Sequence, residues 1–168
     1  MHYGYSANLV LEIKNFTCRV YNQRIKVMEC AFSKYGTSYY GLSARMMFDR
    51  DVDRSFKAHV ALDVMPKNTR QTMHVADMTF NVCVFLKQML NNQILRPLAL
   101  ELKRVCNLPA KCPFKKDFMY ETKNFTVTAK TVPPYLPLMD FEFKVEIYDK
   151  NQIIGNWIAT GATSAKAK

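Results

Sequence analysis

Five cysteines offer the most readily interpreted chemistry in this sequence: Cys18, Cys30, Cys83, Cys106 and Cys112. Thiols form disulfides, bind metals or act as nucleophiles, and their spacing helps to distinguish these uses. The sequence contains no Cys-x-x-Cys, and none of its three histidines lies at a ligand spacing from a cysteine. A zinc finger and a redox motif are therefore not predicted, whereas disulfides of a secreted domain are.

Three acidic residues have the one-three-five spacing of a calcium-binding loop: Asp49, Asp51 and Asp53. Such a loop requires Gly at its sixth position and Glu at its twelfth, where this chain has Arg54 and Val60. The segment is better explained as a solvated turn, and no metal site is predicted.

Catalytic motifs are missing from the sequence as well. It has no Gly-x-Ser-x-Gly and no His-Glu-x-x-His, and its five glycines form no phosphate-binding loop. His59 falls on the outward side of an alternating run, so we interpret it as a surface histidine. We expect neither an enzyme nor a cofactor.

The net charge of +10, from 24 Lys+Arg against 14 Asp+Glu, favours polyanionic partners. Lys111, Lys115 and Lys116 interleave with Phe114 and Phe118, as in a platform that stacks nucleic-acid bases. A turn leading into a strand with inward aromatic rings explains the same pattern, and the other basic residues are scattered. No nucleic-acid partner is predicted.

Two glycosylation sequons, Asn15-Phe16-Thr17 and Asn124-Phe125-Thr126, agree with an exported protein. We therefore predict glycans on Asn15 and Asn124 and a secreted, extracellular location. Residues 1–14 are interpreted as a lead-in without a recognisable signal peptide, and no transmembrane segment is expected. The alternative is a cytosolic protein whose thiols are free.

Three runs with a period of two predict strands at 39–48, 56–64 and 141–148. We predict that the first two form a hairpin through residues 49–54, and that the third forms another hairpin with 153–160. Weaker strands are expected at 9–20, 25–35, 71–82 and 117–131. The inward rows of the three runs are Tyr40, Leu42, Ala44, Met46 and Phe48; Phe56, Ala58, Val60, Leu62 and Val64; and Phe141, Phe143, Val145 and Ile147.

Apolar residues at spacings of three and four predict an amphipathic helix over 84–105, with a break around 91–96 because of Pro97. The fold class is therefore mainly β, a two-sheet sandwich with one helical insertion. At 168 residues the chain is long enough for one domain, which we place at 15–160, followed by a loose tail at 161–168.

Several short segments, in this order, resemble the ML lipid-recognition superfamily. More closely, the chain resembles an insect-expanded branch of secreted proteins that contains the chemosensory-B gustatory proteins, over about residues 15–160. The segments are Asn15-Phe16-Thr17-Cys18, Glu29-Cys30, Phe80-Asn81-Val82-Cys83-Val84-Phe85-Leu86, Asn107-Leu108-Pro109-Ala110-Lys111-Cys112-Pro113-Phe114 and Pro133-Pro134-Tyr135-Leu136-Pro137.

This resemblance implies an immunoglobulin-like sandwich whose sheets splay apart around a lipid, with the three inward rows as the cavity lining. It also implies a Cys83–Cys112 disulfide and a second between Cys18 and Cys30. Cys106 departs from the pattern: it remains free, competes with Cys83 for Cys112, or pairs with a second chain.

We expect a secreted, monomeric, non-enzymatic carrier of lipids or other small hydrophobic molecules, acting in chemosensation or pheromone response. The alternative is an extracellular interaction module with a packed core that acts on a receptor or channel through its basic surface.

Overall fold

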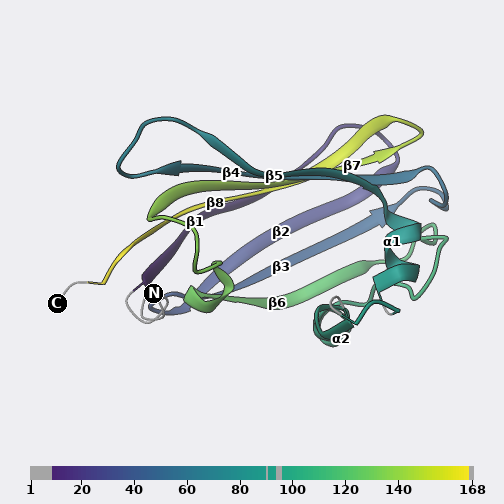
Figure 1. Cartoon of the computed structure of the whole chain (residues 1–168). Helices are drawn as coiled ribbons and strands as arrows, with labels where there is room; N and C mark the ends of the chain where they lie inside the picture. Colours follow the sequence, from purple (N-terminus) through teal and green to yellow (C-terminus); the bar gives the residue numbers. More distant parts are fainter. Residues whose placement is uncertain (1–8, 90, 94–95, 167–168) are drawn as a thin grey trace.

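The computed structural model describes residues 9–89, 91–93 and 96–166. Two antiparallel sheets face each other, and two short helices lie at one end of the pair (Figure 1). The prediction of a mainly β sandwich with a helical insertion is confirmed.

The larger sheet has five strands in the order β1-β8-β7-β4-β5. The smaller sheet has three, in the order β2-β3-β6. The strands span Leu9–Val20 (β1), Ile25–Gly36 (β2), Tyr39–Phe48 (β3), Phe56–Pro66 (β4), Met73–Asn81 (β5), Tyr120–Thr128 (β6), Met139–Asp149 (β7) and Gln152–Ala165 (β8).

The helical insertion consists of α1 (Val82–Met89) and α2 (Arg96–Val105), and a 3-10 turn, η1 (Ala129–Thr131), follows β6. The predicted interruption of the helix is present, since α1 ends at Met89 and α2 begins one residue before Pro97. Pro is tolerated in the first turn of a helix because the N–H that it lacks would have no partner there. Residues 90, 94 and 95 lie outside the described part of the chain.

The predicted hairpin between 39–48 and 56–64 is wrong. β3 pairs with β2 and β6, whereas β4 pairs with β5 and β7 in the other sheet. The connecting residues, 49–55, cross from one sheet to the other, a gap of about 10 Å in sandwiches. Two backbone hydrogen bonds between Val52 and Phe114, 2.8 and 2.9 Å long, fix this crossing. Alternation shows which face of each strand is buried but does not identify its partner.

The second predicted hairpin, between β7 and β8, is confirmed. Its two-residue loop consists of Lys150 and Asn151, with φ of 51° and 62°. Two consecutive positive φ angles are the signature of a type I′ turn, whose twist matches that of the flanking strands.

The expected loose tail from Gly161 is also wrong. β8 continues to Ala165 and pairs with β1 as far as Leu9, so the domain starts before residue 15 as well. A Cβ atom at Gly161 would collide with the Glu12 carbonyl and the Phe141 ring. The absence of a side chain at Gly161 therefore allows the Glu12 backbone and the Phe141 ring to pack closely against β8. Residues 167 and 168 of the predicted tail lie outside the described part.

Candidate functional site

A cavity of about 430 Å³ lies between the two sheets. Its wall is almost entirely apolar and comes from both inner faces and from the end of the helical insertion. The cavity is open to solvent, and Phe143 on its wall is 41% exposed. The wall residues are Phe16, Leu42, Ala44, Arg45, Met46, Leu102, Cys106, Leu108, Tyr120, Glu121, Thr122, Phe125, Phe143, Val145, Trp157 and Ala159.

Two packed clusters close the sandwich on either side of this cavity. One is built on Leu11, Ile13 and Tyr40, with Phe141 packed against it. The other is a larger cluster that adjoins α1. Its buried members are Ile25, Met46, Phe48, Val52, Phe56, Ala58, Phe114, Tyr120, Ile147 and Ile154.

The residues of the predicted inward rows on β3 and β7 therefore do not all line the cavity: those at the ends of each row belong to the packed clusters, and those in the middle form the wall. On β3, Tyr40 belongs to the first cluster and Phe48 to the second, while Leu42 and Ala44 between them line the cavity. β7 repeats this arrangement, with Phe143 and Val145 on the wall between residues of the two clusters. On β3, the small side chain of Ala44 lies between the aromatic residues Tyr40 and Phe48 and leaves space open.

The β4 row does not reach the cavity. Phe56 and Ala58 are buried in the second cluster, and Val64 is 1% exposed elsewhere in the core. Val60 and Leu62 are partly buried and are not wall residues. β4 lies beyond β7 in the larger sheet, farther from the middle of the interior than the prediction assumed.

Sequence reasoning missed Phe16 on β1 and Phe125 on β6 because both strands contain a bulge. On β1, Leu11 and Ile13 are buried, but the register shift before Asn15 turns Phe16 inward. On β6, a shift opposite Leu42 and Ala44 has the same effect on Phe125. An extra residue exchanges the two faces of a strand, so a strict period of two fails there.

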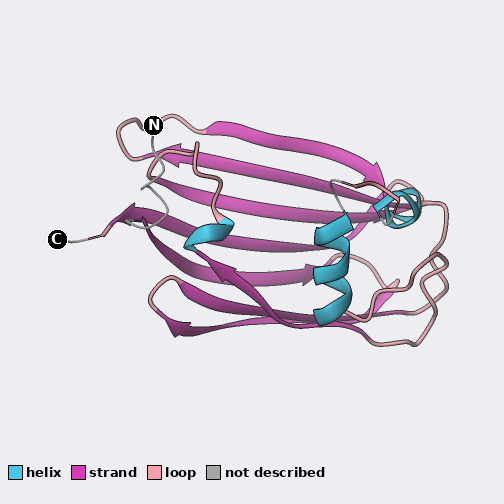
Figure 2. Ribbon diagram, turned by 60° about the horizontal axis from the view of Figure 1, so that its bottom comes forward, coloured by secondary structure: helices cyan, strands magenta, loops and turns pink. Residues whose placement is uncertain are grey.

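The helical insertion forms the rim of the cavity. Leu102 of α2 lies on the wall, as do Cys106 and Leu108 just beyond the helix. In Figure 2, α2 lies crosswise to the strands near one end of the sandwich. Leu108 is 39% exposed although it borders the cavity, which places it at the opening.

Polar groups on the wall are few. The Cys106 thiol donates to Thr122 Oγ1 at 2.9 Å, and Arg45 Nε pairs with Glu29 at 3.2 Å. Trp157 Nε1 is buried and has no hydrogen-bond partner among the described residues. Within that part of the chain, no nucleophile on the wall is hydrogen-bonded to a general base.

The two disulfides join Cys18 to Cys30 and Cys83 to Cys112, with Cα separations of 6.1 and 5.5 Å. The first connects β1 to β2 and therefore ties one sheet to the other. The second ties the start of α1 to the segment before β6. Cys106 is free.

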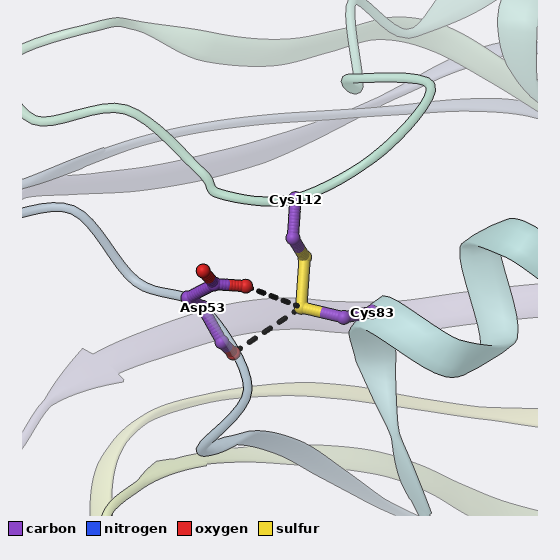
Figure 3. Close-up of side chains that lie close together, drawn as sticks. All are labelled: Asp53, Cys83 and Cys112. Atoms are coloured by element: carbon purple, nitrogen blue, oxygen red, sulfur yellow. Dashed lines mark hydrogen bonds between the residues drawn. A yellow bond between two sulfur atoms is a disulfide. The ribbon is translucent and has the colours of Figure 1, made fainter.

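Asp53 lies beside the second disulfide (Figure 3), with its carbonyl oxygen 3.2 Å from the Cys83 sulfur. This is a sulfur–oxygen contact, because a disulfide sulfur carries no proton to donate. The three residues have the side-chain types of a metal site, but neither sulfur is available as a thiolate.

The other two aspartates of the calcium-like spacing point to separate partners. Arg50 hydrogen-bonds to Asp49 at 2.9 Å and lowers the pKa of that carboxyl. Asp51 accepts from the backbone N–H of Lys116 at 2.8 Å.

His59 was predicted to be a surface histidine, but its side chain is partly buried between two carboxylates. Its Nδ1 lies 3.0 Å from Glu146, its Nε2 lies 2.6 Å from Asp77, and its side chain is only 24% exposed. The hydrogen bond to Glu146 and then that to Asp77 raise the pKa of His59. His74 pairs with Asp63 at 2.6 Å, which raises the pKa of His74.

Both sequon asparagines are exposed on strands at the edges of their sheets. Asn15 follows the bulge of β1, and Asn124 has a φ of 54° at the irregularity of β6. In the lysine–phenylalanine segment, Phe114 is 2% exposed and cannot stack on a base, whereas Phe118 is 46% exposed. In the described part, neither helix has the length and hydrophobicity needed to cross a bilayer.

A family model described as "Protein of unknown function (DUF1091)" matches residues 58–143. The match runs from β4 through the helical insertion and β6 into β7, so it includes much of the cavity wall. No curated protein matches the sequence. Since the matched stretch covers just over half of the chain, the protein belongs to this family of unknown function.

Proposed function

We propose that this protein binds a small hydrophobic molecule, such as a lipid, in the cavity between its sheets. The observation that carries the proposal is the apolar cavity of about 430 Å³ that opens to solvent between two packed clusters. Its size falls within the range of about 300–1,000 Å³ typical of ligand pockets. No catalytic step is proposed.

Binding would be driven by removal of apolar ligand surface from water, at about 25 cal/mol per Å². The wall offers few polar groups to orient a ligand, so shape and hydrophobicity would dominate selection. A polar end of an amphiphile would stay at the opening, beside Phe143 and Leu108, where wall side chains are exposed.

The resemblance to the ML superfamily and to the chemosensory-B branch supports the same proposal, since lipids are held between sheets in the former. Two disulfides and two exposed sequons support secretion as a glycoprotein. We propose an extracellular carrier or sensor in chemosensation or pheromone response.

The alternative, an interaction module acting on a receptor or channel, assumes a fully packed core. The cavity is the observation that favours binding of a hydrophobic molecule over this alternative. A packed domain would fill the space around Ala44 and Ala159, since cavities are costly to maintain.

The test begins with protein secreted from insect cells and with mass spectrometry of its lipid extract. We expect a bound lipid in a fixed ratio to the protein, and saturable binding of a fluorescent fatty acid or sterol after delipidation. Ligand should also slow alkylation of Cys106, the free thiol on the wall. Absence of saturable binding by correctly oxidised protein would favour the interaction module.

A further inference from the structure

The helical insertion and the segment that follows it as far as Cys112 carry a concentration of positive charge. Between Val82 and Cys112 the sequence has five basic residues and one acidic residue. They are Lys87, Arg96, Lys103, Arg104, Lys111 and Glu101.

One side of α2 gathers three of these basic residues around an apolar one. Arg96, Leu100 and Arg104 follow at intervals of four, and Lys103 lies three after Leu100, so all four share one side of the helix. All four are exposed, and Leu100 is 54% exposed. We call these four residues the basic face.

The inward side of α2 is apolar and occupied. Ala99 is 4% exposed, and Leu102 lies on the cavity wall. The helix is therefore held on the sandwich by one side while the basic face points outward.

Further exposed apolar side chains lie in the helical insertion and just after it. Val84 in α1 is 51% exposed, and Leu108 at the cavity opening is 39% exposed. In the described part of the chain, neither Arg96 nor Lys103 forms an ion pair with a carboxylate. Their charges are available to an external partner.

We propose that the basic face docks on the surface of an anionic lipid membrane. Interfacial helices combine exposed apolar side chains, which enter the headgroup region, with Lys and Arg, which attract anionic lipids. A second copy of the chain would bring two positively charged faces together. Charge complementarity therefore favours the anionic surface over self-association.

Docking at this face brings the cavity opening, marked by Leu108, next to the lipid surface. Exchange of a hydrophobic molecule between membrane and cavity would then need only a short path out of the lipid. That consequence rests on the proposed function, whereas the docking itself does not require an occupied cavity.

The test is sedimentation of the purified, oxidised full chain with vesicles of phosphatidylcholine alone or mixed with phosphatidylserine. We expect binding to the mixed vesicles only, weakened by added salt. The double substitution Arg96→Ala/Lys103→Ala should reduce affinity about fivefold for each basic side chain, or about 25-fold together. Leu100→Ser should weaken binding without changing the charge.

The matched control is Lys34→Ala/Lys130→Ala, which removes the same charge from exposed positions. Lys130 lies in η1, the short green turn in Figure 1, toward the opposite end of the sandwich from α2. This variant should bind mixed vesicles like the wild type, and far-ultraviolet circular dichroism should show that all variants are folded.

Three results would overturn the docking proposal. They are equal binding to both vesicle types, no binding to either, and a loss of vesicle affinity in the control variant as large as in Arg96→Ala/Lys103→Ala. A dimer that Leu100→Glu dissociates would assign the face to a second copy instead. A variant with a filled cavity, Ala44→Phe, should still sediment with mixed vesicles, so failure of ligand binding and failure of docking can be distinguished.

Discussion

Phe48 and Phe56 pack edge to face across the interior, with ring centroids 5.6 Å apart and planes at 82°, although they belong to different sheets. Phe114 lies edge to face with both rings, at 5.9 and 5.0 Å. These aromatic contacts join the sheets beside the cavity and so maintain the spacing that keeps it open.

Phe48→Ala should therefore destabilise the fold by about 3–5 kcal/mol, the usual cost of truncating a buried Phe. Phe48 is 0% exposed. The free energy of unfolding from urea denaturation measures the change. Tyr135→Ala is the control, because Tyr135 is 78% exposed and its loss should change stability by less than about 0.5 kcal/mol. If the two substitutions lowered the free energy of unfolding equally, the aromatic contacts of Phe48 would not be what joins the sheets.

Filling the cavity should abolish ligand binding while the fold is kept. Ala44→Phe places a ring in the space between the clusters, since Ala44 lies on the wall. Ala31→Phe, on the outer side of the adjacent strand β2, adds the same ring where Ala31 is exposed. Titration with a fluorescent fatty acid should show saturation for Ala31→Phe and none for Ala44→Phe. Unchanged affinity in Ala44→Phe would place the ligand elsewhere.

The pairing of His59 with Glu146 and Asp77 should make stability depend on pH. The pKa of His59 is raised in the folded state, so its contribution is complete below the ordinary histidine pKa of about 6.5 and falls as pH rises through the folded value. His59→Gln should therefore lower the urea midpoint more at mildly acidic than at alkaline pH.

His74→Gln provides the comparison, because the His74 side chain is 71% exposed and its pair with Asp63 is screened by solvent. His74→Gln should lower the urea midpoint less than His59→Gln does at every pH. Ligand binding should stay within a few-fold of wild type for His59→Gln, since His59 is not on the cavity wall. If His59→Gln lowered the urea midpoint more at alkaline than at mildly acidic pH, the pairing of His59 with Glu146 and Asp77 would be contradicted.

Loss of the Cys83–Cys112 disulfide should cost about 3–4 kcal/mol in the chain-entropy model, because it closes a separation of 29 residues. Replacing both cysteines by Ser should lower the free energy of unfolding by this amount. Cys106→Ser should have little effect, since a hydroxyl can also donate to Thr122. Peptide mapping without reduction identifies the pairs, and a Cys106–Cys112 peptide would contradict the structure.

Much of the strand content could be predicted because burial of one face leaves a period of two in the sequence. β3, β4 and β7 are examples, and the interrupted helix followed from the position of Pro97. The pairing of β3 with β4 was predicted wrongly because alternation carries no information about partners. The crossing of residues 49–55 depends on contacts with Phe114, which is distant in the sequence.

The cavity wall was predicted only where strands are regular. Leu42, Ala44, Met46, Phe143 and Val145 lie on it as expected. Phe16 and Phe125 lie beyond bulges. Trp157 and Ala159 alternate on β8, where a period of two could have revealed them. Cys106 and Leu108 reach the wall through the docking of α2, which only the tertiary structure determines.

Trp157 allows the most direct measurement of the central claim. It is the single tryptophan of the chain and lies on the cavity wall, so its fluorescence reports on the cavity alone. A fatty acid brominated along its chain quenches tryptophan only at close range. We predict saturable quenching in the delipidated, oxidised wild type and in Ala31→Phe, reversed by unbrominated fatty acid and lost in Ala44→Phe. Quenching that is linear in concentration, or equal in Ala44→Phe, would contradict binding between the sheets.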